Sequence, residues 1–190
     1  MKIVKTLATA VLTAMLTLTA CAKTNKTSED MTTSDKKAIV CYFSATGTTA
    51  QAAKRIAEVA SADLHEIVPA EKYTAADLDW TDSTSRSSVE MHNPASRPAI
   101  SNPAIDLSGY QVVYIGYPNW WNTHPTIINT FIEANDLKGK TIVPFMTSGG
   151  SHITNSEKML REQYPDLTFG QGMLMNGKSD SDIKNWVSQF

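Results

Sequence analysis

The chain of 190 residues carries 17 basic and 19 acidic side chains, so its formal net charge is −2. The first 20 residues contain two lysines and no acidic residue, and their removal would leave a charge of −4. A protein with this mildly acidic balance lacks the basic surface that a phosphate backbone requires, which argues against a nucleic-acid partner.

The N-terminal segment 1–20 has the layout of a secretory signal. Lys2 and Lys5 precede an apolar stretch, residues 7–18, that is too short to span a membrane. The sequence LTAC at residues 18–21 resembles the lipobox of bacterial lipoproteins, with Cys21 as the lipidated first residue of the mature protein. The alternative is an ordinary signal peptide followed by a chance cysteine. We expect an exported protein that a lipid anchor on Cys21 holds at the membrane of the bacterial cell envelope.

Residues 21–37 predict a flexible tether. Apart from Ala22 and Met31 they contain no aliphatic side chain after the cysteine, so they cannot build a core. With Cys21 lipidated, only Cys41 remains, and no intramolecular disulfide can form. Cys41 lies in the middle of a predicted strand, where we expect a small buried side chain rather than a nucleophile.

The segment 38–58 contains the most informative motif of the chain. Residues 38–43 predict a strand, and a helix is predicted from residue 49 onward because alanines and Ile56 recur at helical spacing. The turn SATGTT between them supplies Ser44, Thr46, Gly47, Thr48 and Thr49. Hydroxyls, a flexible glycine and the free amides of a helix start predict a monophosphate site, since a Walker loop would need a lysine. The alternative is a helix cap without a ligand.

The remaining elements alternate along residues 38–190. Further strands are predicted at 63–68, 111–117, 141–146 and 172–175, and further helices at 126–133, 155–164 and 180–190. Residues 69–110 are irregular, with one possible short helix around 83–91, and a loop of this length is often functional. The alternation predicts one doubly wound α/β domain, with a five-stranded parallel sheet of order 2-1-3-4-5 between two helical layers.

Ligands of such sheets bind beyond the carboxyl ends of the strands, where three of the predicted loops meet. SATGTT follows the first strand, GYPNWWNTHP (116–125) the third and MTSGGSH (146–152) the fourth. Adjacent tryptophans in a turn suit a flat aromatic ring, and a glycine-rich loop can offer amides to its polar edge. A phosphate, a ribityl chain and a tricyclic ring make FMN the matching ligand. The alternative is that the tryptophans cover a sheet end and the glycines form only a turn.

On these motifs, residues 38–190 resemble the flavodoxin family, in particular a bacterial flavodoxin-like branch with GYPxWW and TSGG segments. Segments 73–78 and 95–100 also resemble this branch. The resemblance implies a flavodoxin-like three-layer αβα fold, a bound FMN and contacts of the SATGTT residues with its phosphate. The sequence contains no flavin-attachment motif of the DGATGAT type, so we expect FMN binding to be non-covalent. The residues that it places around the isoalloxazine ring are Pro118, Asn119, Trp120, Trp121, Thr147, Ser148, Gly149 and Gly150.

Asn122 departs from the expected pattern, because relatives are expected to carry glycine after the tryptophan pair. In flavodoxins a small residue beside flavin N5 permits a peptide flip that tunes the redox potentials. Asparagine adopts a positive φ more readily than most residues, so the flip stays open. Asn122 is therefore kept among the predicted FMN-binding residues.

Three functions remain open from the sequence. The first is low-potential electron transfer by a membrane-anchored flavodoxin-like protein, whose donor and acceptor are redox proteins or a small quinone-like molecule. The second is an FMN-dependent reductase that passes electrons from NAD(P)H to a quinone, with His124 or His152 as proton carriers. The third is an exported binding module without a flavin.

Other chemistries find little support in the sequence. The four histidines and Cys41 lack metal-ligand spacing, and Ser151 and His152 lie outside any GxSxG elbow. Trp80 and Trp186 are expected to pack in the core or on the surface rather than to contact a flavin. The candidates to close over the ligand from the irregular segment are Tyr73, Arg86 and Arg97.

Overall fold

The computed structural model describes residues 37–190. The expected signal segment, the lipidation site Cys21 and the tether up to residue 36 lie outside these residues. The strands are β1 (Ala38–Tyr42), β2 (Asp63–Glu66), β3 (Val112–Pro118), β4 (Thr141–Thr147), β5 (Thr168–Phe169) and β6 (Met173–Leu174). The helices are α1 (Thr48–Ala60), α2 (Arg86–His92), α3 (Ile127–Ala134), α4 (Thr154–Gln163) and α5 (Asp180–Val187).

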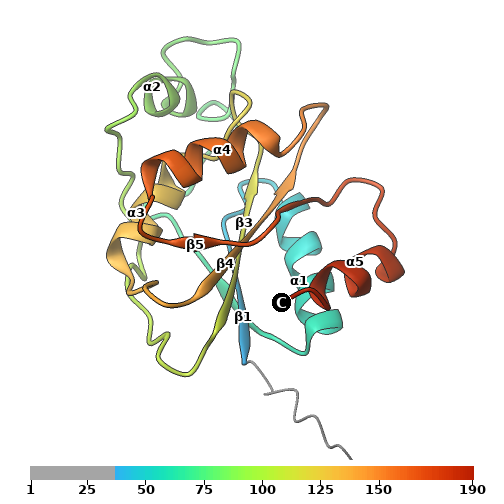
Figure 1. Ribbon diagram of the computed structural model, residues 1–190. Helices are drawn as coiled ribbons and strands as arrows, with labels where there is room; N and C mark the ends of the chain where they lie inside the picture. Colours follow the sequence, from blue (N-terminus) through green and yellow to red (C-terminus); the bar gives the residue numbers. More distant parts are fainter. Residues whose placement is uncertain (1–36) are drawn as a thin grey trace, which may run out of the picture. The chain divides into compact units, whose positions relative to one another are not determined.

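The strands form one parallel sheet of order β2-β1-β3-β4-β5, which confirms the predicted topology. In its centre, Ile39 of β1 lies opposite Asp63 of β2 on one side and Val113 of β3 on the other. Every connection between neighbouring parallel strands must cross from one end of the sheet to the other, and the helices supply these crossovers. The carboxyl ends of β1, β3 and β4 therefore lie at the same end of the molecule (Figure 1).

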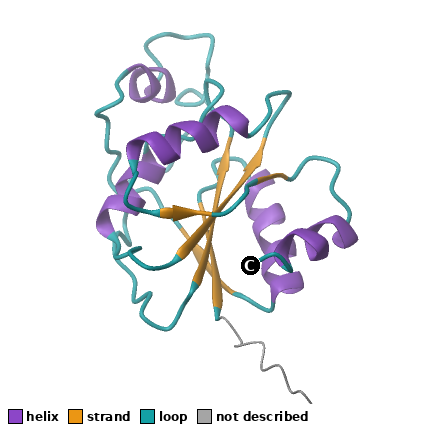
Figure 2. Cartoon of the chain, viewed as in Figure 1, coloured by secondary structure: helices purple, strands orange, loops and turns teal. Residues whose placement is uncertain are grey.

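Helices cover both faces of the sheet, α1 and α5 on one face and α3 and α4 on the other (Figures 1 and 2). The alternation of β1 shows how the sequence builds both interfaces. Val40 and Tyr42 belong to the core beneath α1 and α5, whereas Ile39 and Cys41 belong to the core beneath α3 and α4. Strands buried on both faces read as continuous apolar runs, as these do. Cys41 is fully buried, and burial raises the pKa of its thiol, as expected for a packing residue.

The edge next to β4 differs from the single strand predicted at 172–175. Two short strands share this position: β5 pairs with residues 141 and 142, and β6 pairs with residues 145 and 146. Pro144 lies between these pairings and has no N–H to donate to the edge chain. The edge chain leaves the ladder here, and a Cβ on Gly172 would lie 2.8 Å from the Pro144 carbonyl oxygen. Pro144, which lies within the apolar run of β4, therefore separates the edge chain into β5 and β6.

The irregular segment 69–110 contains α2, which begins after the N-cap Ser85, close to the short helix expected around 83–91. The part of the segment around α2 lies beyond the carboxyl ends of the strands in Figure 1, and the chain after α2 returns to the other end of the sheet, where β3 begins. The closing helix α5 ends at Val187, three residues before the predicted end, with Ser188 at the C-cap position. Within residues 37–190, none of the helices has the length and hydrophobicity needed to cross a lipid bilayer.

Candidate functional site

The SATGTT turn forms the N-terminal cap of α1. Gly47 is the N-cap residue with φ of 91°, a left-handed conformation that glycine adopts without strain. Its N–H donates to Ser44 Oγ at 3.1 Å, and no side chain caps the helix. The first intrahelical bond runs from the Gln51 N–H to the Gly47 carbonyl, so the amides of Thr48 and Thr49 precede it. These amides and the helix dipole favour an anion at this turn.

The three threonines of this turn divide into two kinds. Thr46 and Thr48 are exposed, and their hydroxyl oxygens lie 3.5 Å apart at the mouth of the turn. Thr49 is buried, and its hydroxyl forms a 2.8 Å hydrogen bond with the hydroxyl of Thr147 at the end of β4. Thr147 in turn accepts the Asn119 N–H through its carbonyl at 2.7 Å. The three carboxyl-end loops are thus joined through Thr147.

The tryptophan pair lies in a tight turn after β3. Trp120 and Thr123 exchange two backbone hydrogen bonds of 3.0 and 2.9 Å. The central residues Trp121 and Asn122 have φ of 48° and 61°, the left-handed geometry of a type I′ turn. Asn155 of α4 donates to the Asn122 carbonyl at 2.9 Å and fixes the far side of this turn. A tryptophan at positive φ is uncommon, and such backbone outliers cluster at ligand sites.

The glycine-rich loop after β4 is held by Asn176, which follows β6, and by its own Ser148. Asn176 accepts from the Ser148 N–H at 2.9 Å and donates to the Ser148 carbonyl at 2.7 Å. The Ser148 hydroxyl oxygen accepts from the amides of Gly150 and Ser151. Gly149 and Gly150 are exposed at the rim of this end of the molecule.

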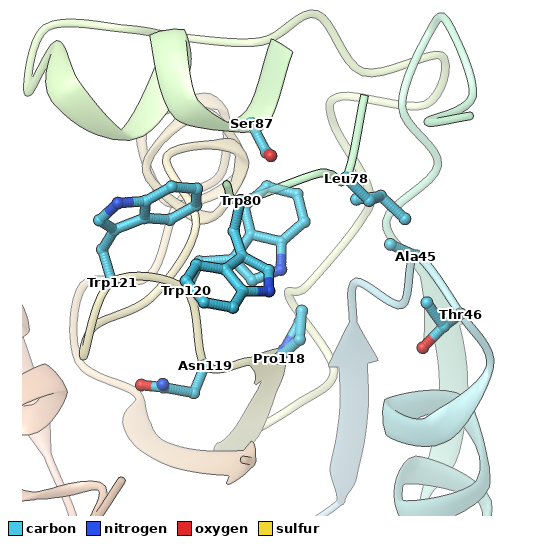
Figure 3. Close-up of a pocket in the computed structure, with 9 residues that line it drawn as sticks. All are labelled: Ala45, Thr46, Leu78, Trp80, Ser87, Pro118, Asn119, Trp120 and Trp121. Atoms are coloured by element: carbon cyan, nitrogen blue, oxygen red, sulfur yellow. The ribbon is translucent and has the colours of Figure 1, made fainter. Parts of the chain in front are cut away.

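A cavity of about 380 Å³ lies between the phosphate-loop region and the tryptophan turn (Figure 3). Its walls come from three segments: the turn after β1, the loop after β3 and the irregular segment 69–110. The residues that line it are Ala45, Thr46, Leu78, Trp80, Ser87, Pro118, Asn119, Trp120 and Trp121. No lining residue carries a charge, and four of them are aromatic or proline. Such a wall suits a flat, uncharged ring with few polar atoms.

Two polar atoms of the cavity wall are buried without a partner among the described residues. These are Ser87 Oγ and Asn119 Oδ1, which come from α2 and from the loop after β3. Buried polar atoms normally have hydrogen-bond partners. The Ser87 side chain points into the cavity in Figure 3, whereas the Asn119 side chain points away from it, so the Ser87 hydroxyl is the one of the two that a bound ligand can pair. The isoalloxazine ring of FMN offers both carbonyl acceptors and an N–H donor. The residues present therefore fit the ring as well as the phosphate of FMN.

The irregular segment also holds both tryptophans in place. The ring of Tyr73 contacts the ring of Trp120 edge-on, with centroids 5.3 Å apart, and His92 of α2 contacts Trp121 at 5.9 Å. Arg86 stacks over the Tyr73 ring at 3.9 Å without lining the cavity. Arg97 instead forms an ion pair with Glu133 of α3, so it does not close over the cavity.

The two histidines considered as proton carriers lie outside the cavity. His124 is almost completely buried, and its Nδ1 lies 3.2 Å from the hydroxyls of Thr123 and Ser156. Burial lowers the pKa of His124 to about 4, so this side chain is neutral at pH 7 and does not exchange protons there. His152 is exposed and does not line the cavity. Residues 37–190 contain no group of three or more His, Cys, Asp or Glu side chains that could hold a metal ion.

The structure brings only part of the predicted site together. Thr46, Pro118, Asn119, Trp120 and Trp121 line one cavity, and Thr147 is hydrogen-bonded to the wall of that cavity. The predicted residues that do not line it are Ser44, Gly47, Thr48, Thr49, Asn122, Thr147, Ser148, Gly149 and Gly150. Of these, Ser44, Gly47, Thr48 and Thr49 belong to the same turn as Thr46, which does line the cavity.

Four lining residues are not predicted from the sequence. One of them, Trp80, is expected from the sequence to serve only packing. They are Ala45, Leu78, Trp80 and Ser87. The length of segment 69–110 was a signal that this part of the chain contributes to function. No periodicity or motif in it indicates which of its side chains face the cavity. Trp186, in contrast, packs in the core beneath α5, as expected.

Comparison with known proteins agrees with this architecture. A family model described as Flavodoxin matches residues 37–190. A crystal structure from Bacteroides uniformis ATCC 8492, of a protein provisionally assigned as a flavoprotein, is 55% identical, with a TM-score of 0.78, over 80% of this chain and 97% of that chain. A similarly assigned protein from Bacteroides eggerthii DSM 20697 is 52% identical, with a TM-score of 0.79, over 80% and 96% of the two chains.

A more distant structure shares the fold. It is a flavoprotein from Lactobacillus acidophilus NCFM in complex with FMN, 23% identical, with a TM-score of 0.61, over 80% of this chain and 98% of that chain. No curated protein matched the sequence. The family model covers the whole described domain, and the two Bacteroides structures share more than half of its aligned residues. The chain belongs to the flavodoxin family.

Proposed function

We propose that this protein binds FMN non-covalently and transfers electrons at low potential. The observation that carries the proposal is the uncharged cavity of about 380 Å³ between the SATGTT turn and the tryptophans Trp120 and Trp121. The buried Ser87 hydroxyl on its wall has no partner among the described residues, and a ligand can supply one. Membership of the flavodoxin family supports the same ligand.

The phosphate would be held by the SATGTT turn. The hydroxyls of Thr46 and Thr48 and the free amides at the start of α1 supply donors without a formal positive charge. Gly47, in its left-handed conformation, permits the backbone to approach the ligand closely. No Lys or Arg lies within the turn, which matches a monophosphate better than a triphosphate.

The ring would lie against the tryptophan turn. FMN supplies one-electron and two-electron redox chemistry when bound, and the protein sets the environment of the ring. The neutral cavity wall offers no cation to a negatively charged reduced ring, so reduction to that form is disfavoured and the potential is lowered. The left-handed backbone of Asn122 lies in the same turn and can influence the potentials through its peptide groups.

The test is a titration of the purified protein with FMN, followed by the quenching of flavin fluorescence. We expect saturable quenching at micromolar FMN or below, a yellow complex, and resolved one-electron steps in a potentiometric titration. A single two-electron step would contradict the carrier function while leaving FMN binding intact. Failure to quench FMN fluorescence at micromolar concentration would instead favour a binding module without flavin.

The reductase alternative has lost its proposed proton carriers. His124 is buried and neutral, and neither His124 nor His152 lines the cavity. We therefore prefer electron transfer to or from a redox protein or a small quinone-like molecule. Steady-state oxidation of NADH or NADPH in the presence of a quinone, well above the rate without protein, would reverse this preference.

We further propose that a lipid on Cys21 tethers the domain to the membrane of the cell envelope. The support is the LTAC sequence at the end of the apolar segment 7–18, followed by polar residues up to 36. In cells grown with a labelled fatty acid, the wild-type protein is expected to carry the label and to sediment with membranes. Cys21→Ser should abolish both, and a labelled Cys21→Ser protein would overturn this proposal.

A further inference from the structure

Ser87 of α2 has a buried hydroxyl for which the protein itself provides no partner. The residue is 1% exposed, and its Oγ has no hydrogen-bond partner among the described residues. Its backbone N–H is satisfied by the Asp77 carbonyl at 2.9 Å. A buried hydroxyl without a partner lowers stability, because it has given up its bonds to water. In Ser87 the backbone N–H is thus paired, and the side-chain hydroxyl is unpaired.

The neighbouring serine shows what a structural hydroxyl looks like in this helix. Ser88 is also 1% exposed, but its Oγ accepts a 2.9 Å hydrogen bond from Ser85 Oγ. Ser85 is the N-cap of α2 and accepts from the Ser88 N–H. Two adjacent serines with equal burial thus differ in one property: Ser88 is paired within the helix, and Ser87 is not.

The Ser87 side chain lies on the wall of the cavity, across from Pro118 and Asn119 in Figure 3. A hydroxyl can donate or accept a hydrogen bond, so Ser87 can pair with either kind of polar atom on a ligand. A ligand that satisfies this hydroxyl needs a polar atom, either a donor or an acceptor, within hydrogen-bond reach of it. The isoalloxazine ring of the proposed FMN carries such atoms on its pyrimidine portion.

The position of Ser87 is set by the segment that carries it. Arg86, the preceding residue, donates to Glu90 at 2.7 Å and to the Glu71 carbonyl at 2.8 Å, and it stacks over Tyr73. The Tyr73 hydroxyl donates to the same Glu90 at 2.5 Å. This cluster ties α2 to the start of the segment, so the Ser87 hydroxyl is held at the cavity before a ligand arrives.

We propose that Ser87 is a flavin-contact residue whose hydroxyl hydrogen-bonds the polar part of the isoalloxazine ring. Segment 69–110 is then a wall of the flavin site and not only a connection between β2 and β3. This inference rests on the proposed FMN function and deepens it, because it assigns a ring contact to a segment outside the three carboxyl-end loops.

The experiment compares Ser87→Ala with the matched variant Ser88→Ala in the otherwise unchanged protein. For each protein we would measure the melting temperature without flavin and the Kd for FMN and for riboflavin, which has the ring but no phosphate. Ser87→Ala is expected to melt at or above the wild-type temperature, because an unpaired buried group is removed. Its Kd for both flavins should rise by roughly three- to tenfold, the loss of about one hydrogen bond. Ser88→Ala should melt at a lower temperature and keep the wild-type Kd for both flavins.

Two results would overturn the assignment of Ser87. One is a Kd within twofold of wild type for both flavins, and the other is a melting temperature lowered as far as that of Ser88→Ala. A change in the Kd for FMN without a change for riboflavin would also overturn it, because the effect would then act on the phosphate. Failure of the wild-type protein to bind either flavin would refute the proposed function itself, and with it the inference.

Discussion

The rings of Tyr73 and Trp120 meet edge-on, with centroids 5.3 Å apart and an angle of 78° between their planes. Phe43 at the end of the first strand contacts Trp120 in the same way, at 5.6 Å and 90°. Tyr73 is itself tied down by its hydrogen bond to Glu90 and by the guanidinium of Arg86. The orientation of a predicted flavin-stacking residue is therefore set in part by Tyr73, which lies in segment 69–110 and not in any of the three carboxyl-end loops.

Replacing Tyr73 by alanine should weaken flavin binding, although Tyr73 itself does not line the cavity. The change removes the edge-on contact with Trp120 and the tilted contact with Phe43, each worth about 1 kcal/mol, and it frees the Trp120 ring to rotate. We expect the Kd for FMN to rise about tenfold, measured by fluorescence quenching. Tyr73→Phe is the control, since it keeps the ring contacts and loses only the bond to Glu90. An unchanged Kd in Tyr73→Ala would show that Trp120 does not need this support.

Thr48→Ala should weaken the binding of FMN and leave that of riboflavin unchanged. The Thr48 hydroxyl is exposed at the mouth of the SATGTT turn, where it can reach a phosphate. Loss of one hydrogen bond to a charged group costs about 1.5–3 kcal/mol, so the Kd for FMN should rise by roughly tenfold or more. Parallel titrations with the two flavins make the measurement. Equal losses for both flavins would contradict a role at the phosphate.

Thr49→Val provides the structural counterpart within the same turn. The Thr49 hydroxyl is buried and bonded to Thr147, so its removal leaves the Thr147 hydroxyl without this partner. We expect the free energy of unfolding of the flavin-free protein to fall by about 1–3 kcal/mol, measured by urea denaturation. Thr48→Ala, in contrast, should leave this free energy unchanged.

Asn122→Gly should preserve the fold, whereas Asn122→Val should destabilise it. The residue has φ of 61°, which glycine adopts freely and a β-branched residue adopts with strain. We expect valine to lower the free energy of unfolding by about 1–2 kcal/mol, and glycine to leave it within about 0.5 kcal/mol of wild type. The bond from Asn155 to the carbonyl of residue 122 involves the backbone and is available to both variants. Equal stabilities of the two variants would argue against the left-handed turn.

The stability of the protein should depend on pH through His124. Burial lowers the pKa of His124 to about 4, below the value of about 6.5 in an unfolded chain. Between these values the unfolded state binds a proton that the folded state does not, so stability rises with pH. The contribution is fully present above pH 6.5 and is lost as the pH falls through 4, a change of about 3 kcal/mol.

The measurement is urea denaturation between pH 4 and 7 for wild type and His124→Gln. Both proteins share the contributions of the acidic residues, so the difference between their curves isolates His124. We expect wild type to lose more stability than the variant as the pH falls. Parallel curves would show that His124 titrates normally in the folded state.

Much of the fold could be predicted because its signals are local. Continuous apolar runs mark β1, β3 and β4, and helical spacing marks α1 and α3, so the alternation and the order 2-1-3-4-5 follow. The break between β5 and β6 was not predicted, because the sequence does not show toward which neighbouring strand the backbone nitrogen of Pro144 points. Whether the missing N–H interrupts the edge strand depends on which side of β4 that strand lies.

For the site, the sequence by itself determined which loops meet, since the carboxyl ends of parallel strands must share one end of the sheet. Thr46 and the turn from Pro118 to Trp121 were predicted in this way, and they line the same cavity. Only the tertiary structure decided that Trp80 and Ser87 complete its wall and that His124 is buried. Side chains of an irregular segment follow no period, so long-range contacts such as that of Arg86 with Tyr73 select which of them face the cavity.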